Sequence, residues 1–319
     1  MAKPVRLGLI GAGGMANAVH YPSLAELDDV ELAALCDLVP EKLEKTAQRF
    51  GISRTFSDYR RMLDEVEVDA VYLLMPPHHL FDLAIYCASH GKHIFMEKPP
   101  GVTYEQARMM AHACEQNGVL GMCGFNRRYI PLIRECRRRV DERGGVIQAV
   151  STFYKCHSSH QPYYAGAIDI LSCDAVHAVD LLRWMGGEPK HVVAHISRRP
   201  PNVMDDAFNV LIEFENGATG VLLTNWCVGG RRHTFEMHGS GISCFIDPDD
   251  RALIYADGAA EPEVLLTREV AGSEERHHYY GFLGESRHFI DCIQSGESPS
   301  SSLSDAALKI GRASCRERV

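Results

Sequence analysis

The sequence predicts an α/β protein with an N-terminal, doubly wound parallel sheet and a C-terminal α+β domain built on a large, mainly antiparallel open sheet. Three observations support this prediction. The chain has 319 residues, more than a single domain usually holds. In residues 1–125, short runs of consecutive apolar residues alternate with segments that have helical periodicity. This pattern is typical of parallel strands covered by helices on both faces. Beyond residue 125 the pattern changes to mostly strands, in which Phe208, Val210, Ile212 and Phe214 alternate with Asn209, Leu211 and Glu213, as in a sheet with one covered face.

Five apolar runs mark the expected strands of the first domain, residues 1–125. They are residues 5–10, 32–36, 70–75, 93–96 and 119–123. Helical spacing fills the intervals, and Gly51, Gly91 and Gly118 stand where a helix should end. Thr103 and Gln106 have the spacing of a capping box, so a helix should begin there. Strands that alternate with helices in this way predict a parallel sheet.

The second domain, residues 126–309, should begin with a helix at 130–140 and a strand at 146–153, followed by a helix from 172 to 185. Mostly strands follow, and Asn216-Gly217 is a strong hairpin signal between the runs 208–214 and 220–226. The last segment, 310–319, has no helical periodicity and resembles the translation of a common sequencing adapter. We expect it to be a non-native tail and assign it no function.

Composition excludes several classes of function. The formal net charge of −9 argues against nucleic acid as a partner, and the arginines of 134–139 are expected to form a solvated helix face. No apolar run reaches 18 residues, so no membrane span is expected. The start of the chain lacks a signal-peptide core, and eleven scattered cysteines contain no Cys-x-x-Cys pair. These features predict a cytoplasmic protein with reduced thiols and no metal site.

A glycine turn, Gly11-Ala12-Gly13-Gly14-Met15-Ala16, follows the first strand and opens a helix. In this context it predicts the dinucleotide site of a Rossmann domain, because the glycines let backbone N–H groups approach a pyrophosphate. Asp37 ends the second strand, where a carboxylate can bind the adenosine ribose. It would repel a 2′-phosphate, so the sequence favours NAD over NADP.

Met96-Glu97-Lys98-Pro99-Pro100 ends the fourth strand and supplies a plausible catalytic group, Lys98, beside the nucleotide. Pro76 and His79 follow the third strand and could border the nicotinamide ribose. A purely structural role at the start of the next helix is equally open for His79.

A histidine-containing helix is the second candidate for chemistry. Cys173, His177, Asp180 and Trp184 share one stripe of it, and Asp174 lies three residues before His177, within side-chain reach. A histidine beside carboxylates can relay protons near neutral pH. A histidine on a helix is also commonly a structural residue, so this pattern alone does not decide the role. Cys156, His157 and His160 fit no zinc pattern, and we interpret them as part of a polar loop.

From Val5 to Lys309 the chain resembles the Gfo/Idh/MocA family of nicotinamide-dependent sugar and cyclitol oxidoreductases. The resemblance rests on four segments: residues 11–15, 97–99, 124–129 and 176–184. It implies a Rossmann domain followed by a domain whose open sheet often forms oligomer contacts, so a homodimer or homotetramer is expected. It also implies that Lys98 and His177 flank the substrate carbon beside the nicotinamide.

The glycine turn, the strand ends and this resemblance together define the candidate site residues. The catalytic candidates are Lys98, His177 and Asp174. The cofactor candidates are Gly11, Gly13, Gly14, Met15, Asp37, Pro76, His79, Glu97, Lys98 and Asn126. The substrate candidates are Arg127, His157, Tyr164, Asp180 and Tyr280.

One departure from the family pattern concerns the histidine helix. Family dehydrogenases usually carry an aspartate four residues before the histidine, whereas this chain has Cys173 there. Asp174 lies one position later, about 100° further around the helix. Either Asp174 substitutes through a local shift, or His177 works without that partner, or the chain binds cofactor but turns over poorly.

The leading hypothesis is NAD-dependent oxidation of a secondary hydroxyl on a sugar, cyclitol or related polyol, or the reverse reduction. In this scheme His177 exchanges the hydroxyl proton, Lys98 stabilises the alkoxide, and Asp174 or Asp180 orients His177. One alternative is a glycosidase-like enzyme that uses NAD for transient oxidation. Another is a sugar- or nucleotide-sensing binder without catalysis.

Overall fold

The computed structural model describes residues 3–156, 163–166, 168–200, 202 and 204–313. The chain divides into two compact units. The first comprises Met1–Asn126, Arg276–His278 and Phe282–Gly311, and the second comprises Arg127–Glu275, Tyr279–Gly281 and Arg312–Val319. Within the described ranges, no helix is both long and apolar enough to cross a membrane.

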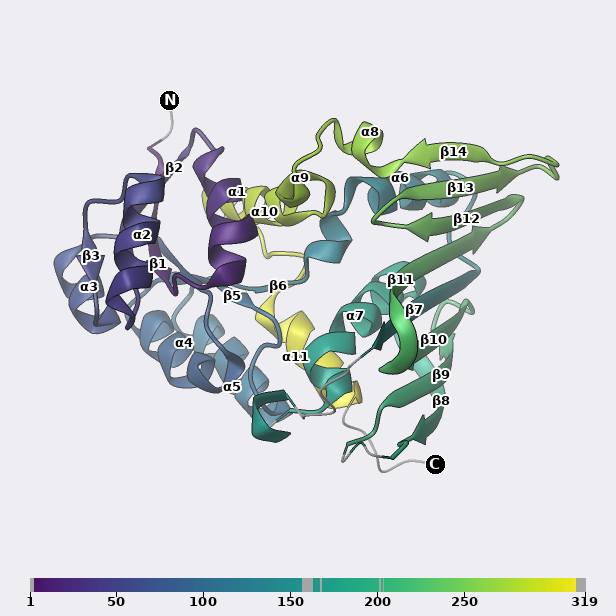
Figure 1. Ribbon diagram of the computed structural model, residues 1–319, viewed down its shortest axis with the longest axis horizontal. Helices are drawn as coiled ribbons and strands as arrows, with labels where there is room; N and C mark the ends of the chain where they lie inside the picture. Colours follow the sequence, from purple (N-terminus) through teal and green to yellow (C-terminus); the bar gives the residue numbers. More distant parts are fainter. Residues whose placement is uncertain (1–2, 157–162, 167, 201, 203, 314–319) are drawn as a thin grey trace. The chain divides into compact units, whose positions relative to one another are not determined.

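The first unit is built on a six-stranded sheet with the order β3-β2-β1-β4-β5-β6, in which every pairing is parallel (Figure 1). Its strands are β1 (Val5–Ile10), β2 (Val30–Cys36), β3 (Thr55–Phe56), β4 (Ala70–Leu73), β5 (His93–Glu97) and β6 (Gly121–Gly124). The central strands are almost completely buried, as their continuous apolar runs require. The predicted doubly wound parallel sheet is confirmed.

Helices connect these strands and begin or end largely where the sequence indicates. They are α1 (Tyr21–Ala25), α2 (Pro40–Phe50), α3 (Tyr59–Glu65), α4 (Leu80–Ser89) and α5 (Tyr104–Gln116). Thr103 caps α5, since its hydroxyl accepts a hydrogen bond from the N–H of Gln106. Gly51 ends α2 in the left-handed conformation, with φ of 68°. A π-helical turn, Ala16–His20, precedes α1.

The second unit holds an eight-stranded sheet with the order β14-β13-β12-β11-β7-β10-β9-β8. Its strands are β7 (Gln148–Cys156), β8 (Pro189–Ser197), β9 (Ala207–Phe214), β10 (Thr219–Asn225), β11 (Cys227–Gly239), β12 (Ile242–Asp247), β13 (Arg251–Ala256) and β14 (Glu263–Leu266). The pairing of β7 with β10 is parallel, and the other pairings in this sheet are antiparallel. The mainly antiparallel sheet is therefore also confirmed.

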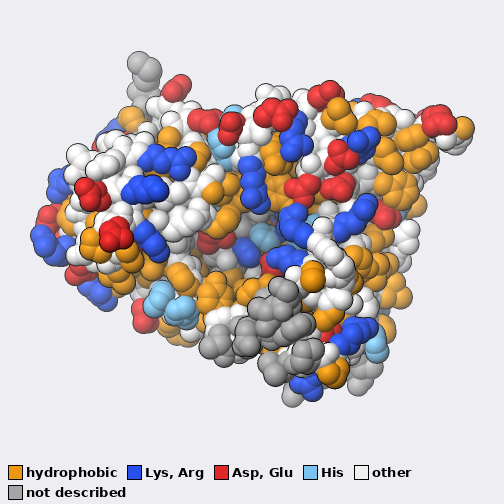
Figure 2. All heavy atoms as spheres, viewed as in Figure 1, with side chains coloured by type: hydrophobic (Ala, Val, Ile, Leu, Met, Phe, Trp, Pro, Cys, Tyr) orange, Lys and Arg blue, Asp and Glu red, His pale blue; other side chains and the backbone are white. Residues whose placement is uncertain are grey.

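Helices cover one face of this sheet. The helices are α6 (Pro131–Asp141), α7 (Val176–Gly186) and α8 (Thr267–Ala271). Helix α6 packs on β11, β12 and β13, and α7 packs on β7 and β10. Strand residues that face these helices, such as Phe153, Phe235 and Cys244, are fully buried. The opposite face keeps exposed apolar side chains, and Figure 2 shows hydrophobic side chains gathered over the strands of this sheet.

Two late segments of the chain, Arg276–His278 and Phe282–Gly311, belong to the first unit, whereas the expected second domain, residues 126–309, included them up to residue 309. Three helices follow β14 and α8: α9 (Arg276–Tyr279), α10 (Phe282–Ser295) and α11 (Leu303–Ala313). Arg287 of α10 forms an ion pair with Asp29, with an Nη1–Oδ1 distance of 2.6 Å. Ser301 donates a hydrogen bond to the carbonyl of Cys123 at the end of β6. These contacts join segments about 180–260 residues apart, so local sequence patterns could not reveal them.

Helix α11 also extends into the segment expected to be a non-native tail. Of residues 310–319, the first four lie in α11, and the other six lie outside the described residues.

Candidate active site

The glycine turn leaves space that the protein itself does not fill. Gly11 has φ of 107°, and a Cβ there would lie 2.5 Å from the carbonyl oxygen of Leu74, so only glycine fits. At Gly13 and Gly14, by contrast, a Cβ would meet nothing within 4 Å. Packing therefore does not require glycine at these two positions. Open backbone between a strand and a helical turn is what close approach of a pyrophosphate needs.

Asp37 is bound to this turn by its carboxylate. One oxygen accepts a hydrogen bond from the N–H of Ala12 at 2.6 Å, and the other accepts one from Val39 at 2.8 Å. The end of β2 and the turn after β1 are thereby held together. A carboxylate has about four acceptor positions, so these two bonds leave capacity for ribose hydroxyls.

The strand order brings the other cofactor candidates to the same edge of the sheet. In a parallel sheet all carboxyl ends meet at one edge, and the crevice outside that edge binds the dinucleotide. Asp37 follows β2, the glycine turn with Met15 follows β1, and Asn126 follows β6. Between them, Pro76 and His79 follow β4, and Lys98 follows β5.

Glu97, at the end of β5, is held by a histidine that the sequence did not indicate. His20 lies 2.7 Å from Glu97 (Nε2 to Oε1), and the other carboxylate oxygen accepts the backbone N–H of Lys98 at 3.0 Å. His20 is fully buried between the rings of Phe95 and Phe282. Burial raises the pKa of Glu97, but the hydrogen bond from His20 and the charge of Lys98 outweigh it, so the pKa lies below its usual value. The backbone at Lys98 is therefore fixed by an ionised, buried carboxylate.

In the second unit, the carboxylate of Asp174 forms an ion pair with Lys155 of β7 and accepts a hydrogen bond from the hydroxyl of Tyr163 at 3.1 Å. Burial, followed by the nearby charge of Asp174, raises the pKa of Tyr163. Asp174 lies in a π-helical turn, Leu171–Ala175, directly before α7 and His177. The π-helical turn is a local irregularity of the helix at the position of Asp174.

Two of the substrate candidates, Asp180 and Tyr280, are buried and contact arginines. Asp180 is fully buried, and Arg128 holds its carboxylate in a two-pronged ion pair at 2.8 and 2.9 Å. The Tyr280 ring is 3% exposed, and its hydroxyl accepts a hydrogen bond from Arg231 at 2.9 Å. Both side chains are engaged by arginines in the interior of the second unit, and their role as substrate ligands stays a prediction.

The remaining substrate candidates have varied surroundings. Arg127 is 4% exposed, its guanidinium lies 4.9 Å from the Phe153 ring centre, and its Nη2 lies 3.1 Å from His233 Nδ1. Burial, followed by the charge of Arg127, lowers the pKa of His233, so this imidazole is neutral. Tyr164 is exposed and has a positive φ of 49°. His157 lies outside the described residues.

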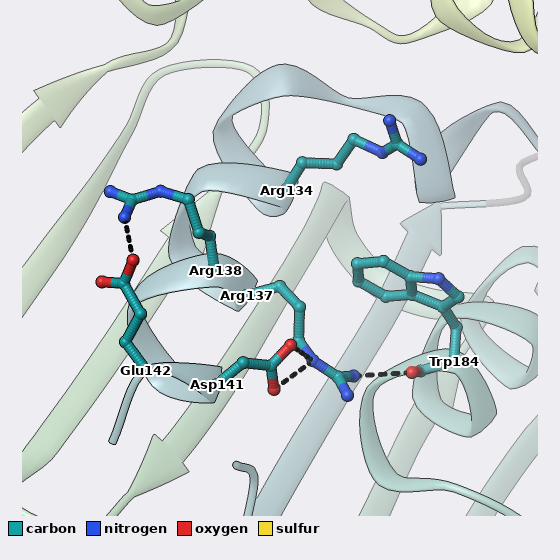
Figure 3. Close-up of a pocket in the computed structure, with 6 residues that line it drawn as sticks. All are labelled: Arg134, Arg137, Arg138, Asp141, Glu142 and Trp184. Atoms are coloured by element: carbon teal, nitrogen blue, oxygen red, sulfur yellow. Dashed lines mark hydrogen bonds and ion pairs between the residues drawn. The ribbon is translucent and has the colours of Figure 1, made fainter. Parts of the chain in front are cut away.

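A pocket in the second unit is lined by none of these candidates. It is lined by Arg134, Arg137, Arg138, Asp141, Glu142 and Trp184 (Figure 3). Arg137 pairs with Asp141 at 2.8 Å, and Arg138 pairs with Glu142 at 2.5 Å. The predicted basic segment is thus a helix face whose arginines are largely neutralised by neighbouring carboxylates.

Comparison with known proteins assigns the chain to a family. Residues 5–125 match the model of the Gfo/Idh/MocA oxidoreductase family with its NAD-binding Rossmann fold, and residues 146–243 match that of the Gfo/Idh/MocA C-terminal domain. The chain is also 32% identical over 234 residues to the rhizopine catabolism protein MocA of Rhizobium meliloti, with 68% of this chain and 70% of that protein covered. The chain belongs to the Gfo/Idh/MocA family.

Other known proteins align along nearly the whole chain. Myo-inositol 2-dehydrogenase of Thermotoga maritima is 26% identical over 324 aligned residues, covering 96% of this chain and 93% of that protein. A dehydrogenase structure from Chromobacterium violaceum superposes with a TM-score of 0.86 at 21% identity, covering 98% and 94% of the two chains. Levoglucosan dehydrogenase in complex with NADH and L-sorbose gives 0.82 at 24% identity, covering 98% and 95%. These two structures share the fold.

As a Gfo/Idh/MocA protein, this chain is an NAD-binding oxidoreductase, and its first unit fits the cofactor. The open backbone at Gly13 and Gly14 suits the pyrophosphate, and Asp37 suits the adenosine ribose. The three catalytic candidates belong to different units, Lys98 to the first and His177 and Asp174 to the second. Sequence reasoning missed His20, Lys155 and Tyr163, because each is recognised only through its contact with a predicted residue.

Proposed function

We propose that this protein oxidises a secondary hydroxyl of a sugar, cyclitol or related polyol, or catalyses the reverse reduction, with Lys98 and His177 as catalytic residues. The observation that carries the proposal is the open glycine turn at the sheet edge where β5 ends in Glu97-Lys98. Relatives include proteins named levoglucosan dehydrogenase, scyllo-inositol 2-dehydrogenase and D-glucoside 3-dehydrogenase. These names indicate cyclic polyhydroxylated substrates.

The first unit supplies the oxyanion partner. NAD, which the glycine turn and Asp37 would hold, would supply the hydride acceptor for oxidation of the substrate. Lys98 donates a hydrogen bond to the reacting oxygen and stabilises the alkoxide charge that develops there. Glu97 fixes the backbone N–H of Lys98, and His20 fixes Glu97, so both act as positioning residues. We propose Pro76, His79 and Asn126 as further cofactor contacts, since they follow neighbouring strands of the same sheet.

The second unit supplies the proton acceptor. His177 stands in the first turn of α7 and takes the hydroxyl proton during oxidation. Asp174, in the turn before α7, forms an ion pair with Lys155 of β7, which supports a polar, charge-balanced environment around the substrate hydroxyls. Cys173 takes the place of the family aspartate, and in this proposal Asp174, in the π-helical turn before α7, compensates for it. Arg127 and Tyr164 remain proposed substrate contacts.

Replacing each catalytic candidate tests this assignment. We expect Lys98→Ala and His177→Ala each to lower kcat by about a hundredfold or more while NAD still binds, since a positioned proton-transfer group contributes at least that factor. NADH formation with a panel of sugars and cyclitols measures turnover, and NAD titration measures binding. His112→Ala, at an exposed position of α5, is the control and should keep parental activity. Unchanged turnover in both variants would contradict the roles of Lys98 and His177.

The same assay separates the alternatives. A dehydrogenase releases NADH in proportion to product, whereas a glycosidase that oxidises transiently would cleave glycosides without net NADH. A sensing binder would bind NAD and a sugar yet reduce no NAD with any polyol of the panel. Net NADH formation with an unglycosylated polyol is the result that we expect.

We further propose a homodimeric or homotetrameric assembly through the open face of the eight-stranded sheet. One row of paired residues crosses the sheet from β8 to β14, and all but Glu236 are apolar. The row is Val193, Leu211, Val221, Val150, Glu236, Phe245, Leu253 and Val264. Val193 is 64% exposed and Leu211 is 56% exposed. Exposed apolar side chains that gather on one face of a protein mark interaction sites.

The cysteines bear on the compartment in which the protein works. All ten cysteines among the described residues are free. Free thiols fit a reducing compartment, so we propose that the protein works in the cytoplasm.

A further inference from the structure

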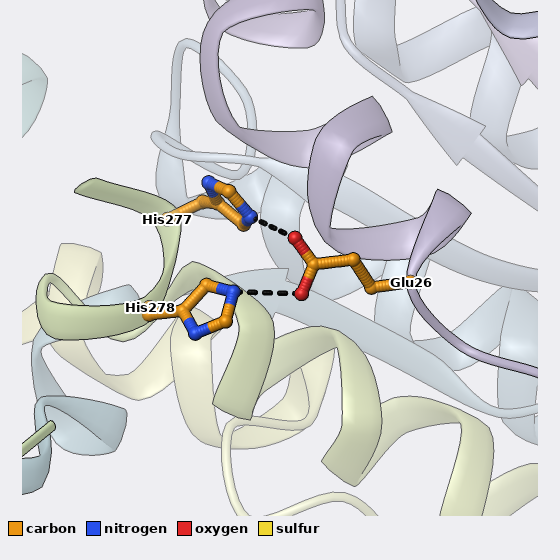
Figure 4. Close-up of side chains that lie close together, drawn as sticks. All are labelled: Glu26, His277 and His278. Atoms are coloured by element: carbon orange, nitrogen blue, oxygen red, sulfur yellow. Dashed lines mark hydrogen bonds and ion pairs between the residues drawn. The ribbon is translucent and has the colours of Figure 1, made fainter. Parts of the chain in front are cut away.

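Three side chains with metal-binding chemistry converge in the first unit, away from the proposed catalytic residues in the sequence. Glu26 follows the end of α1, and His277 and His278 are consecutive residues of α9. The Nε2 atom of His277 lies 2.5 Å from one carboxylate oxygen of Glu26, and that of His278 lies 2.6 Å from the other. Figure 4 shows both imidazole rings pointing at the carboxylate.

The donor set is the kind that binds a borderline transition metal. Two imidazole nitrogens and one carboxylate oxygen are ligands typical of Zn²⁺, and three protein ligands with open positions for water form a common zinc arrangement. One donor atom from each of the three residues lies within 4.8 Å of the others. Among the described residues, this is the single group of three or more histidine, cysteine or acidic side chains with that geometry.

We propose that Glu26, His277 and His278 bind one divalent transition-metal ion of the Zn²⁺ class. Ligands at about 2.1 Å from a tetrahedral ion stand about 3.4 Å apart. The two His–Glu pairs are closer than this, so the side chains need to separate by about 1 Å to admit an ion. The Glu26 side chain is 43% exposed and has freedom to move, whereas His277 is 8% exposed and well anchored.

An ion at this site would link two parts of the first unit that lie far apart in the sequence. Glu26 and His277 are 251 residues apart, and the ion would join α1 to the segment that returns from the C-terminal half of the chain. The ion pair of Asp29 with Arg287 ties the same two parts of the first unit together. The metal therefore acts as a structural clip, and its binding does not depend on the proposed catalytic function.

Zinc binding by the full chain tests this proposal. Exposed thiols also bind zinc, so all variants carry Cys156→Ser and Cys227→Ser, which remove the two exposed cysteines of the described residues. The chelator-stripped protein is titrated with ZnCl₂ in a calorimeter, and bound zinc is counted by mass spectrometry after dialysis. The comparison uses Glu26→Gln, the double variant His277→Ala/His278→Ala, and the double variant His90→Ala/His112→Ala. The last removes two exposed histidines of the same unit and is the matched control.

The parent and the control should bind one zinc ion per chain at this site. Glu26→Gln should weaken binding by more than about tenfold, because even residues that merely support a ligand are worth about 10–100-fold. The double variant His277→Ala/His278→Ala should lose the site. Zinc should also raise the Tm of the parent and the control, and not that of Glu26→Gln.

Equal zinc stoichiometry and affinity in the parent, Glu26→Gln and the His277/His278 double variant would overturn the proposal. So would an equal loss of zinc in the His90/His112 control. If the His277/His278 variant fails to fold, Glu26→Gln decides the question, because glutamine keeps an acceptor for one imidazole N–H. The readouts do not involve catalysis, so they remain valid whatever the substrate assays show.

Discussion

Asp37 illustrates how one side chain serves both the fold and cofactor choice. Its carboxylate accepts hydrogen bonds from the backbone of Ala12 and Val39, so it holds the glycine turn in place. The same negative charge, at the end of β2, would meet the 2′-position of the adenosine ribose and repel a phosphate there. Sequence spacing sufficed to predict this residue, because it ends a recognisable strand. His20, which holds Glu97, had no such signal, since its importance arises from a contact 77 residues away.

Replacing Asp37 should change cofactor preference. We expect Asp37→Ser to raise the KM for NAD by about tenfold or more, the equivalent of one charge-assisted hydrogen bond, and to raise kcat/KM with NADP. Asp37→Asn keeps an acceptor for a backbone N–H but removes the charge, so it should relax the discrimination against NADP with a smaller loss for NAD. Steady-state kinetics with both cofactors measure this. If neither variant gains activity with NADP, the charge of Asp37 does not set the preference.

At the scale of elements, the helix-on-sheet contact of the second unit depends on two glycines around one aromatic ring. Phe214, at the end of β9, is fully buried. A Cβ at Gly186 of α7 would lie 2.1 Å from its ring, and one at Gly220 of β10 would lie 2.7 Å away. The hairpin itself was predicted from Asn216-Gly217 and is confirmed by the antiparallel pairing of β9 with β10. The close approach of α7 was not predictable, because it depends on which face of the sheet the helix covers.

Filling this contact should destabilise the protein. Gly186→Ala forces the Phe214 ring or the helix to move, which we expect to cost about 1–3 kcal/mol, the usual range for overpacking a core. Thermal and denaturant unfolding measure the loss. Gly229→Ala is the control, since a Cβ at that glycine of β11 meets nothing within 4 Å and should leave stability nearly unchanged. An unaltered unfolding midpoint in Gly186→Ala would contradict the close packing of α7 on β9.

At the scale of the whole molecule, the uncovered face of the eight-stranded sheet bears on how the protein assembles. A sheet with one face covered by helices leaves the other face to water or to a partner. In this sheet, the uncovered face carries the apolar row from Val193 to Val264, in register across all eight strands. Burying such a row against a second copy removes apolar surface from water at about 25 cal/mol per Å². The alternation pattern predicted an open face, but the continuity of the row required the observed strand order.

Charges placed in this row should disrupt the assembly. We expect the double variant Val193→Asp/Leu211→Asp to sediment as a monomer under conditions where the parent is a dimer or tetramer, because like charges cannot be buried together without partners. Sedimentation velocity measures the change. Met109→Asp, which places the same charge at an exposed apolar position on α5 of the first unit, should keep the parental state. An unchanged sedimentation coefficient in the double variant would rule out the sheet face as the interface.

The sequence by itself determined what local patterns encode: the parallel and antiparallel sheets, the glycine turn, Asp37, and Lys98 at a strand end. These features depend on periodicity and backbone conformation over a few residues, so a single sequence suffices to predict them. Only the tertiary structure decided that Phe282–Gly311 returns to the first unit, that Lys155 holds Asp174, and that His277 and His278 meet Glu26. Such contacts join residues far apart in the chain, and they arise from the packing of whole elements, which no local pattern specifies.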